Sequence, residues 1–395
     1  MGNDDPAFNS RDRSGSGAVH PPFDTAYPAT SPGHAVVASF VELAEQVGRS
    51  APEPLASLCE MRDHLRAHLR DEGCIHQIPG PKSADYTIAA VDGASAVQSR
   101  YATDIMAATA VAAGGMFNAG PQNSKVLTWA DARAHSRENS SLVQLHMFAR
   151  ELALLELLTH EYRIIDGNHM NPLIEMARAL TGSGALHGAL IGLLSEFDIP
   201  SAIQLLAKPE SGVFSLTKAD TQRRWSNRLR TVQGFSDLPD VTDKVLTAVI
   251  LNEGEMLSPI PASDNAGAIR RSIEPGRGAP QQFKEALGLF LQTVAEERLQ
   301  VTYFKPATLI GALKLQFTAS TSRQKGHLAE AGQLAAVTAR ECFGPAMQEP
   351  LPQYLADQAA KKVSVGLRLI EQQVMTNLPT HTHQFASLLA FEHRS

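Results

Sequence analysis

Two short apolar segments, each followed by Asp-Gly, constrain the fold of this chain more than any other feature. Tyr86–Val91 and Tyr162–Ile165 are rich in apolar and β-branched residues, and they run into Asp92-Gly93 and Asp166-Gly167. Between them, Ser140–Glu161 carries apolar side chains at helical spacing. Adjacent central strands of an α/β sheet converge at one edge, so this order of segments predicts two acids side by side.

The rest of the chain predicts a mixed α/β sheet flanked by helices, with helical insertions in one main domain. Ser201–Leu206 is predicted to be a buried strand that ends near Lys208, and Val301–Phe304 with Ala312–Phe317 a strand pair. The predicted divisions are a disordered tail at 1–32, a helical region at 33–80, the main domain at 81–375 and a tail at 376–395.

The net charge and the search for a secretory signal or membrane span indicate in which cellular compartment the protein is expected. The 395 residues carry a net charge of −6, whereas dedicated DNA-binding domains are usually basic. An enzyme with a local basic channel is still compatible with that balance. The first residues show no secretory signal, and no apolar run approaches the roughly 20 residues of a membrane span. We therefore expect a cytoplasmic protein with no membrane partner.

The paired carboxylates predict a metal site. Two carboxylates at one sheet edge repel each other unless one is protonated or a cation bridges them. Mg²⁺ or Mn²⁺ would relieve that repulsion and activate water for phosphodiester hydrolysis. Glu151, with Glu156 as the alternative, adds a helix carboxylate just before the second strand. Asp-Gly after a strand is also a common turn, so each motif alone indicates a turn more often than a site.

Taken in order, several motifs resemble the NurA nucleases. The motifs are Ala90–Ser95, Arg150-Glu151, Ile164–Asn168, Ile199–Lys208, Leu251–Glu255, Tyr303–Lys305 and Leu313–Leu315. The resemblance implies an RNase H-like fold and Mn²⁺-dependent hydrolysis of DNA, with Asp92, Glu151 and Asp166 as metal ligands. It also implies a homodimer that works with a HerA-like hexameric ATPase translocase, in DNA end processing and repair or in antiviral defence.

One position departs from that family. Its members carry a histidine in a helix after a Pro-rich turn, and here Pro350-Leu351-Pro352 is followed by Asp357 at the matching position. Aspartate can ligate a metal but cannot act as a neutral imidazole base. Asp357 is therefore a catalytic candidate at this position, and a surface acid with no catalytic role is the alternative that stays open.

Three basic residues are candidates for contacting DNA. Lys208 ends a predicted strand, and Arg224 and Arg228 lie one helical turn apart. A run of charges is also typical of a solvated helix face, so that alternative stays open.

Two other functions stay open from the sequence. A chain with this fold and a weakened site could serve as a non-catalytic docking subunit of a translocase. An actin-like ATPase also places Asp-Gly at strand ends, but it needs a glycine-rich phosphate loop, and Val91–Ser99 has one glycine.

Overall fold

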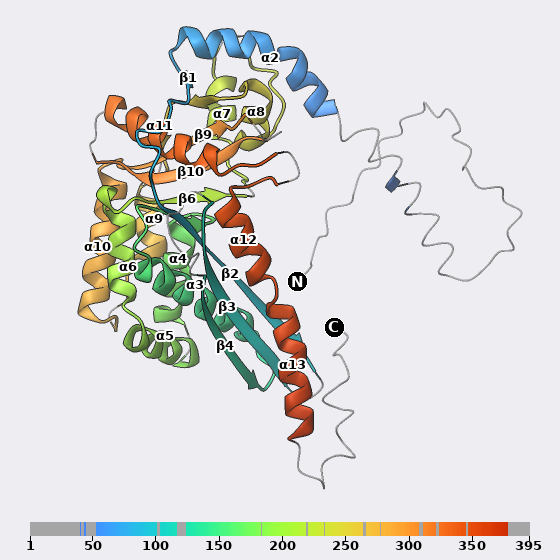
Figure 1. The fold of residues 1–395 in the computed structure, drawn as a ribbon, viewed down its shortest axis with the longest axis vertical. Helices are drawn as coiled ribbons and strands as arrows, with labels where there is room; N and C mark the ends of the chain where they lie inside the picture. The colour runs from blue at the N-terminus through green and yellow to red at the C-terminus, as the bar shows by residue number, and fades with distance from the viewer. Residues whose placement is uncertain are drawn as a thin grey trace, which may run out of the picture. The chain divides into compact units, whose positions relative to one another are not determined.

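The ten β-strands of the described residues form one mixed sheet, with three parallel strands at its centre (Figure 1). The computed structural model describes residues 40, 43–44 and 53–377, except 101–102, 117–123, 183, 219, 233, 264–265, 277, 308–310, 321–323 and 345–346. The chain divides into two compact units, Met1–Ser57 and Leu58–Ser395. Apart from the first turn of α2, the elements below belong to the second unit. The predicted tail at 1–32 lies outside the described residues, as does nearly all of the tail at 376–395.

The strand order across the sheet is β1-β7-β9-β10-β6-β5-β2-β3-β4, with β8 paired to β9. Parallel pairing joins β2 to β5 and β5 to β6, and the other neighbours are antiparallel. The strands are β1 (Ile75–Gln77), β2 (Ile88–Ser99), β3 (Asp104–Gly114), β4 (Lys125–Arg133), β5 (Tyr162–Asp166), β6 (Val213–Thr217), β7 (Glu255–Leu257), β8 (Ile260–Pro261), β9 (Leu299–Lys305) and β10 (Leu313–Thr318).

Helices cover both faces of this sheet. They are α2 (Glu53–Asp71), α3 (Asn139–Leu157), α4 (Met170–Thr181), α5 (Gly184–Glu196), α6 (Ile199–Ala207), α7 (Arg224–Arg230), α8 (Asp243–Ile250), α9 (Ala266–Ile273), α10 (Gln281–Ala295), α11 (Gln324–Arg340), α12 (Leu351–Ala360) and α13 (Val363–Thr376). A 3₁₀ turn, η1, spans Pro209–Ser211. The predicted mixed α/β sheet flanked by helices is confirmed.

The alternation of side chains along the strands separates two cores. Ala89, Val91 and Ile165 point to the face packed by α3, α6 and α10. Ala90 and Ile164 point to the opposite face, over which α11 and α12 lie (Figure 1). Successive strand residues face opposite sides, so each core draws on every second residue.

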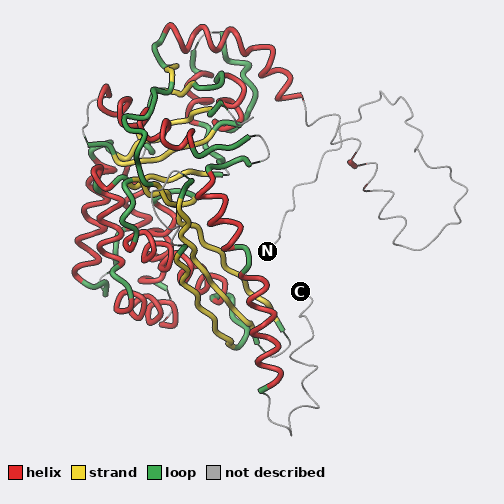
Figure 2. Tube along the Cα trace, in the orientation of Figure 1, coloured by secondary structure: helices red, strands yellow, loops and turns green. Residues whose placement is uncertain are grey.

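The strands β2, β3 and β4 are longer than the parallel strands beside them (Figure 2). Residues 88–91 of β2 pair with β5, and the rest of β2 pairs with β3 alone. The small and apolar segment Asp104–Gly114 is strand β3, which forms a hairpin with β2. The long hairpin therefore continues past the point where β5 ends.

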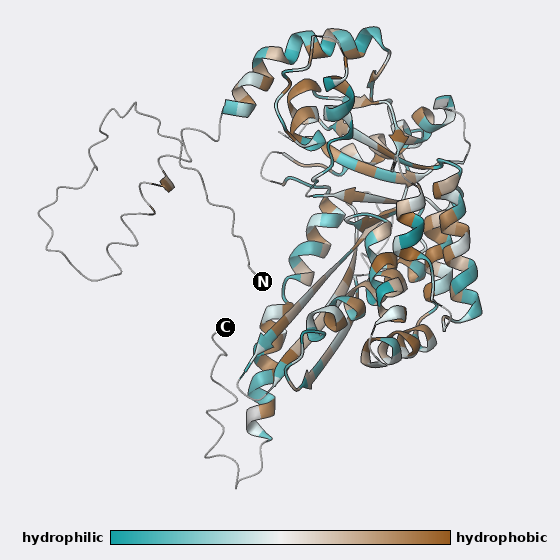
Figure 3. Cartoon of the chain, turned by 180° about the vertical axis from the view of Figure 1, so that it is seen from behind, coloured by the Kyte–Doolittle hydropathy of each residue, from teal (hydrophilic) through white to brown (hydrophobic). Residues whose placement is uncertain are grey.

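Helix α5 is apolar along much of its length (Figure 3). No single helix within the described ranges is long and apolar enough to cross a membrane. The bent pair of α5 and α6, at 82° to each other, meets the criterion by length and composition only.

Candidate metal centre

The register of the parallel strands sets two acids at one level. Val91 of β2 pairs with Ile165 of β5, so the next residue on each strand is Asp92 and Asp166. Ile165 in turn pairs with Ser215 of β6. The two acids that the sequence predicted to be neighbours therefore lie at the same edge of the sheet.

A lysine after β6 reaches the same edge. Asp166 pairs with Leu216, and Lys218 follows two residues later, on the same face as Leu216. By the same alternation Asp92 faces the side of Ile88 and Ala90, which helix α12 covers. Three side chains from three strands thus converge beneath α12.

Lys218 lies among four carboxylates. Its Nζ is 3.0 Å from Asp92 Oδ2, 3.7 Å from Asp166 Oδ2, 3.1 Å from Glu349 Oε2 and 2.8 Å from Asp357 Oδ1. The side chain is 34% exposed, so the group borders solvent. Together with Glu151 these residues form what we call the acid–lysine site.

Glu151 approaches from the other face of the sheet through a gap left by glycine. A Cβ on Gly93 would overlap the Glu151 carboxylate and lie 2.7 Å from Met147 Cγ. Asp92-Gly93 is not a turn, because β2 runs through it to Ser99; the prediction that the strand stops there is wrong. The glycine is needed for close approach of a side chain, whereas Gly167 (φ 87°) does form a turn.

The crowding of acids changes their proton affinity. Burial, then the nearby Asp166, raises the pKa of Asp92 to about 7. Burial, then Asp92 and Asp166, raises the pKa of Glu151 well above its usual range. Burial also raises the pKa values of Asp166 and Glu349. Burial opposes the charge of Lys218, but Asp166 and Asp92 outweigh it and raise its pKa. The positive charge near these carboxylates is therefore too small to offset their burial and their mutual repulsion.

The donor set fits a hard divalent cation. Asp92, Asp166 and Glu151 offer oxygen ligands of the kind that Mg²⁺ and Mn²⁺ prefer. In the part of the chain that the structure describes, no three Asp, Glu, His or Cys side chains are grouped closely enough, as they stand, to hold a metal ion. The ammonium group of Lys218 now lies between these acids. To bind a metal ion, the carboxylates would have to move closer to one another.

Asp357 differs from the inner acids. It accepts hydrogen bonds from Lys218 (2.8 Å), Lys361 (2.6 Å) and Gln358 (3.3 Å). Burial opposes its charge, but the bonds from the two lysines outweigh burial and lower its pKa. Asp357 is therefore held as an anion by lysines.

Three residues of the site were not predicted from the sequence: Lys218, Glu349 and Gln353. Glu349 precedes the Pro-rich turn, and Gln353 of α12 donates from Nε2 to Asp166 Oδ1. Neither stands in a periodic or motif-like context in the sequence. They reach the site only because α12 packs across β2 and β3.

The prediction that Ser201–Leu206 is a strand is wrong, and Lys208 does not reach the site. The segment lies in helix α6, where Asp198 accepts from the Ser201 N–H and Pro200 stands in the first turn. Lys208 caps that helix and precedes the amino end of β6, whereas the acids lie at the carboxyl end. The strand that ends in a lysine is Val213–Thr217, and its lysine is Lys218.

Glu156, the alternative to Glu151, points elsewhere. It lies near Arg163 at the start of β5, where it opposes the effect of burial on the pKa of that arginine. Glu151 is therefore the acid of α3 that joins Asp92 and Asp166.

Arg224 and Arg228 begin and continue the short helix α7. The backbone N–H of Arg224 donates to Asp243 (2.8 Å), and the Arg228 guanidinium lies 5.2 Å from the Trp225 ring centroid. Burial raises the pKa of Cys74, just before β1, and the nearby Arg228 offsets only part of that rise. A role of these arginines in DNA binding stays a prediction.

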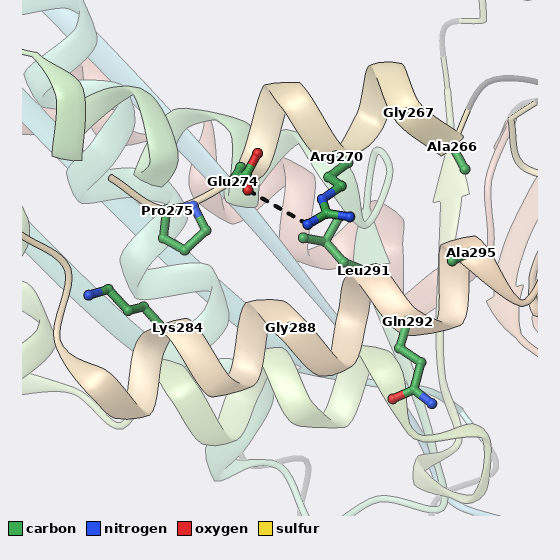
Figure 4. A pocket seen from close by; sticks show the side chains of 10 residues that line it. All are labelled: Ala266, Gly267, Arg270, Glu274, Pro275, Lys284, Gly288, Leu291, Gln292 and Ala295. Carbon is green, nitrogen blue, oxygen red and sulfur yellow. Dashed lines mark ion pairs between the residues drawn. The ribbon is translucent and has the colours of Figure 1, made fainter. Parts of the chain in front are cut away.

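Two surface grooves differ in their relation to the site. One, of about 360 Å³, adjoins it: Met147 touches the Gly93 position, Asn171 is nearest to Gly167, and Arg178 lies further along. The other, of about 490 Å³, lies between α9 and α10 and contains the ordinary helix ion pair of Arg270 and Glu274 (3.8 Å, Figure 4). Of these two grooves, only the first borders the site, and it does so on the side of Gly93 and Glu151.

The fold and the site define an α/β protein with an acidic cluster where the parallel pairing of its central strands ends. Among solved structures, the NurA nuclease from Sulfolobus solfataricus matches 88% of this chain and 98% of its own, with a TM-score of 0.55 and 12% identity. A NurA bound to dAMP and manganese matches 80% of this chain and 94% of its own, with a TM-score of 0.46 and 14% identity. No family model and no curated protein matches the sequence. The chain has a NurA-like fold.

Proposed function

We propose that this chain is a divalent-metal-dependent nuclease that hydrolyses phosphodiester bonds of DNA. The observation that carries the proposal is the register that brings Asp92 and Asp166 level, with Glu151 against them at Gly93. Carboxylates that share too little positive charge favour a divalent cation, Mn²⁺ or Mg²⁺. The likeness of the fold to a nuclease supports the same chemistry.

Each residue of the site has a part in this proposal. Asp92, Asp166 and Glu151 would hold the cation. When bound, a divalent cation supplies a water of lowered pKa and positive charge for the leaving oxygen. Burial, followed by the nearby Asp92 and Asp166, raises the pKa of the Glu151 carboxyl well above its usual range. Lys218 and Lys361 supply positive charge on the α12 side, where a phosphate oxygen would otherwise meet only acids.

The groove beside the site gives a nucleic acid strand room to lie. Its lining includes Gln144 and Asn171 for hydrogen bonds, Phe148 for stacking and Arg178 for a phosphate. Of its lining side chains, Met147 lies against Gly93, and Asn171 is the nearest side chain to the Cβ position of Gly167. A strand cleaved at the acids could therefore continue along this groove.

A translocase partner also belongs to the proposal. With a net charge of −6 the chain is expected to bind DNA weakly alone, because lysine and arginine contacts to phosphate supply most non-specific affinity. A HerA-like hexameric ATPase that threads DNA into a dimer of this chain would raise the local substrate concentration. The work of such a complex would be DNA end processing in repair or defence against foreign DNA. The test is to titrate the ATPase into a cleavage assay and measure the mass of the complex.

A second candidate is a docking subunit with a weakened site. It is favoured by Asp357, which two lysines hold where the family has a histidine. Metal binding separates the two candidates, since a docking subunit needs none.

The decisive experiment compares two glutamates of one helix. Cleavage of linear and single-stranded DNA is measured with Mn²⁺, Mg²⁺ or EDTA for the wild type, Glu151→Gln and Glu156→Gln. We expect cleavage that EDTA abolishes, a loss of at least about 100-fold in Glu151→Gln, and near wild-type rates in Glu156→Gln. Equal rates in all three proteins would show that the nuclease is a contaminant or uses another site.

A further inference from the structure

One ammonium group is shared by carboxylates from separate parts of the chain. Lys218 Nζ lies within 4.0 Å of Asp92 on β2, Asp166 on β5, Glu349 before α12 and Asp357 on α12. Four formal negative charges thus surround one positive charge. Such a position is also where these acids would place a metal ion.

The four acceptors fall into an inner and an outer pair. Asp92 (3.0 Å) and Asp166 (3.7 Å) are the proposed metal ligands on the sheet. Glu349 (3.1 Å) and Asp357 (2.8 Å) come from the segment that packs over it. The ammonium therefore already contacts a second set of acceptors that it can keep if it leaves the first.

We propose that Lys218 is an internal cation that competes with a divalent ion for Asp92 and Asp166, and that Asp357 retains the ammonium when that ion binds. The inference rests on the proposed function. Two cations on the same carboxylates repel each other, and the lysine has a flexible four-carbon stem with which to move aside. Lys218 thereby lowers metal affinity and balances the acids in the metal-free protein.

This gives Asp357 a role of its own at the position where the family has a histidine. A neutral imidazole carries no negative charge to hold an ammonium group, whereas an ionised aspartate does. Lys361 and Gln358 donate to the other oxygen of Asp357 and fix its orientation. Asp357 is then a positioning residue that acts on the metal through Lys218.

The first test measures Mn²⁺ affinity of the metal-free full chain by isothermal titration calorimetry. We expect Lys218→Met to bind Mn²⁺ about tenfold more tightly than the wild type. Lys362→Met is the matched control, because Lys362 is an exposed lysine just after α12 that has no part in the proposed site. Its affinity is expected to stay within about twofold. Lys218→Gln, which keeps a donor without charge, is expected to follow Lys218→Met.

The second test is a double-mutant cycle with Asp357→Asn. We expect this change to weaken Mn²⁺ binding about fivefold in the wild type, because Lys218 then stays on Asp92 and Asp166. In the Lys218→Met background the same change is expected to have less than about a twofold effect. Equal weakening in both backgrounds would make Asp357 a metal ligand and overturn its positioning role.

The outcomes separate this inference from the proposed function. If the wild type and every variant fail to bind Mn²⁺, the proposed nuclease site falls together with the competition. If the wild type binds Mn²⁺ and Lys218→Met binds it equally or more weakly, only the competition is overturned. Circular dichroism of each variant checks the fold, and Lys218→Gln provides the measurement if Lys218→Met does not fold.

Discussion

Two buried ionic clusters of this chain place carboxylates beside cations with opposite results. In the Glu255 cluster (Glu255, Arg66 and Arg70), Arg66 donates to both Glu255 oxygens at 2.7 and 2.9 Å, and Arg70 adds a bond of 3.1 Å. One acid there meets two arginines. In the acid–lysine site one lysine meets four carboxylates.

The pKa values record this difference. Burial opposes the charge of Glu255, but the bonds from Arg66 and the Asn252 N–H outweigh it and lower the pKa of Glu255 to about 2. Burial and Asp166 raise that of Asp92 to about 7. A carboxylate with surplus partners stabilises the fold, whereas acids short of positive charge cost stability and favour an added cation. Glu255 belongs to the segment Leu251–Glu255, which resembles a NurA motif in the sequence, and in the structure it has a structural role.

The largest effect is expected from Asp92→Asn. The amide keeps the shape but removes a proposed metal ligand, so the cleavage rate should fall by about 1,000-fold, or about 4 kcal/mol. The free energy of unfolding should stay equal or rise, because repulsion with Asp166 is relieved. Single-turnover cleavage and urea unfolding measure the two quantities. A large loss of stability in this variant would place Asp92 in the same class as Glu255.

The reverse result is expected from Glu255→Gln. The buried Arg66 would be left without an anion, and the exposed Arg70 would lose a partner, so the free energy of unfolding should fall by about 3 kcal/mol. The metal-dependent cleavage rate per folded molecule should stay within about twofold of the wild type. Urea unfolding together with an activity assay checks both. Loss of cleavage in the folded variant would couple the two clusters.

The clusters should also give opposite dependence of stability on pH. The folded pKa of Asp92 lies above its unfolded value, so its ionisation destabilises the fold as pH rises from about 4 to 7. The folded pKa of Glu255 lies below its unfolded value, so its contribution is complete above about pH 5 and is lost as pH falls toward 2. In metal-free urea titrations, Asp92→Asn should remove about 2 kcal/mol of the decline between pH 4 and 7. Glu255→Gln should leave that decline in place.

The smallest effect is expected from Gly93→Ala. The added methyl would overlap the Glu151 carboxylate, so the free energy of unfolding should fall by about 1–2 kcal/mol. The cleavage rate should also fall, because Glu151 is displaced. Gly188→Ala in α5 is the control, because no heavy atom lies within 4 Å of its added Cβ. That change should stabilise by a few tenths of a kcal/mol, as alanine favours helix. Thermal unfolding of both variants measures the contrast.

The sequence by itself determined the two inner strands, the helix between them and the pair of acids. Apolar β-branched runs and helical spacing are local signals, and each is read within one segment. Asp92, Asp166 and Glu151 were predicted as neighbours, and the register of β2 and β5 brings the aspartates level. The same short-range signals could not separate Ser201–Leu206 from Val213–Thr217, since both are short apolar runs near a lysine. The capping residues Asp198 and Pro200 were the local evidence for a helix.

Only the tertiary structure decided what surrounds those acids. More than a hundred residues separate Lys218 from Glu349, Gln353 and Asp357, and the two segments meet because α12 packs across β2. From the sequence, Gly93 resembles a turn residue, because only its neighbours in the chain can be considered. In the structure glycine is required there because the Glu151 carboxylate of α3 packs against it. The net charge of the site likewise depends on residues from separate segments that only folding brings together. The sequence therefore specified Asp92, Glu151 and Asp166, whereas only tertiary packing decided that Lys218 is the cation in contact with the two aspartates.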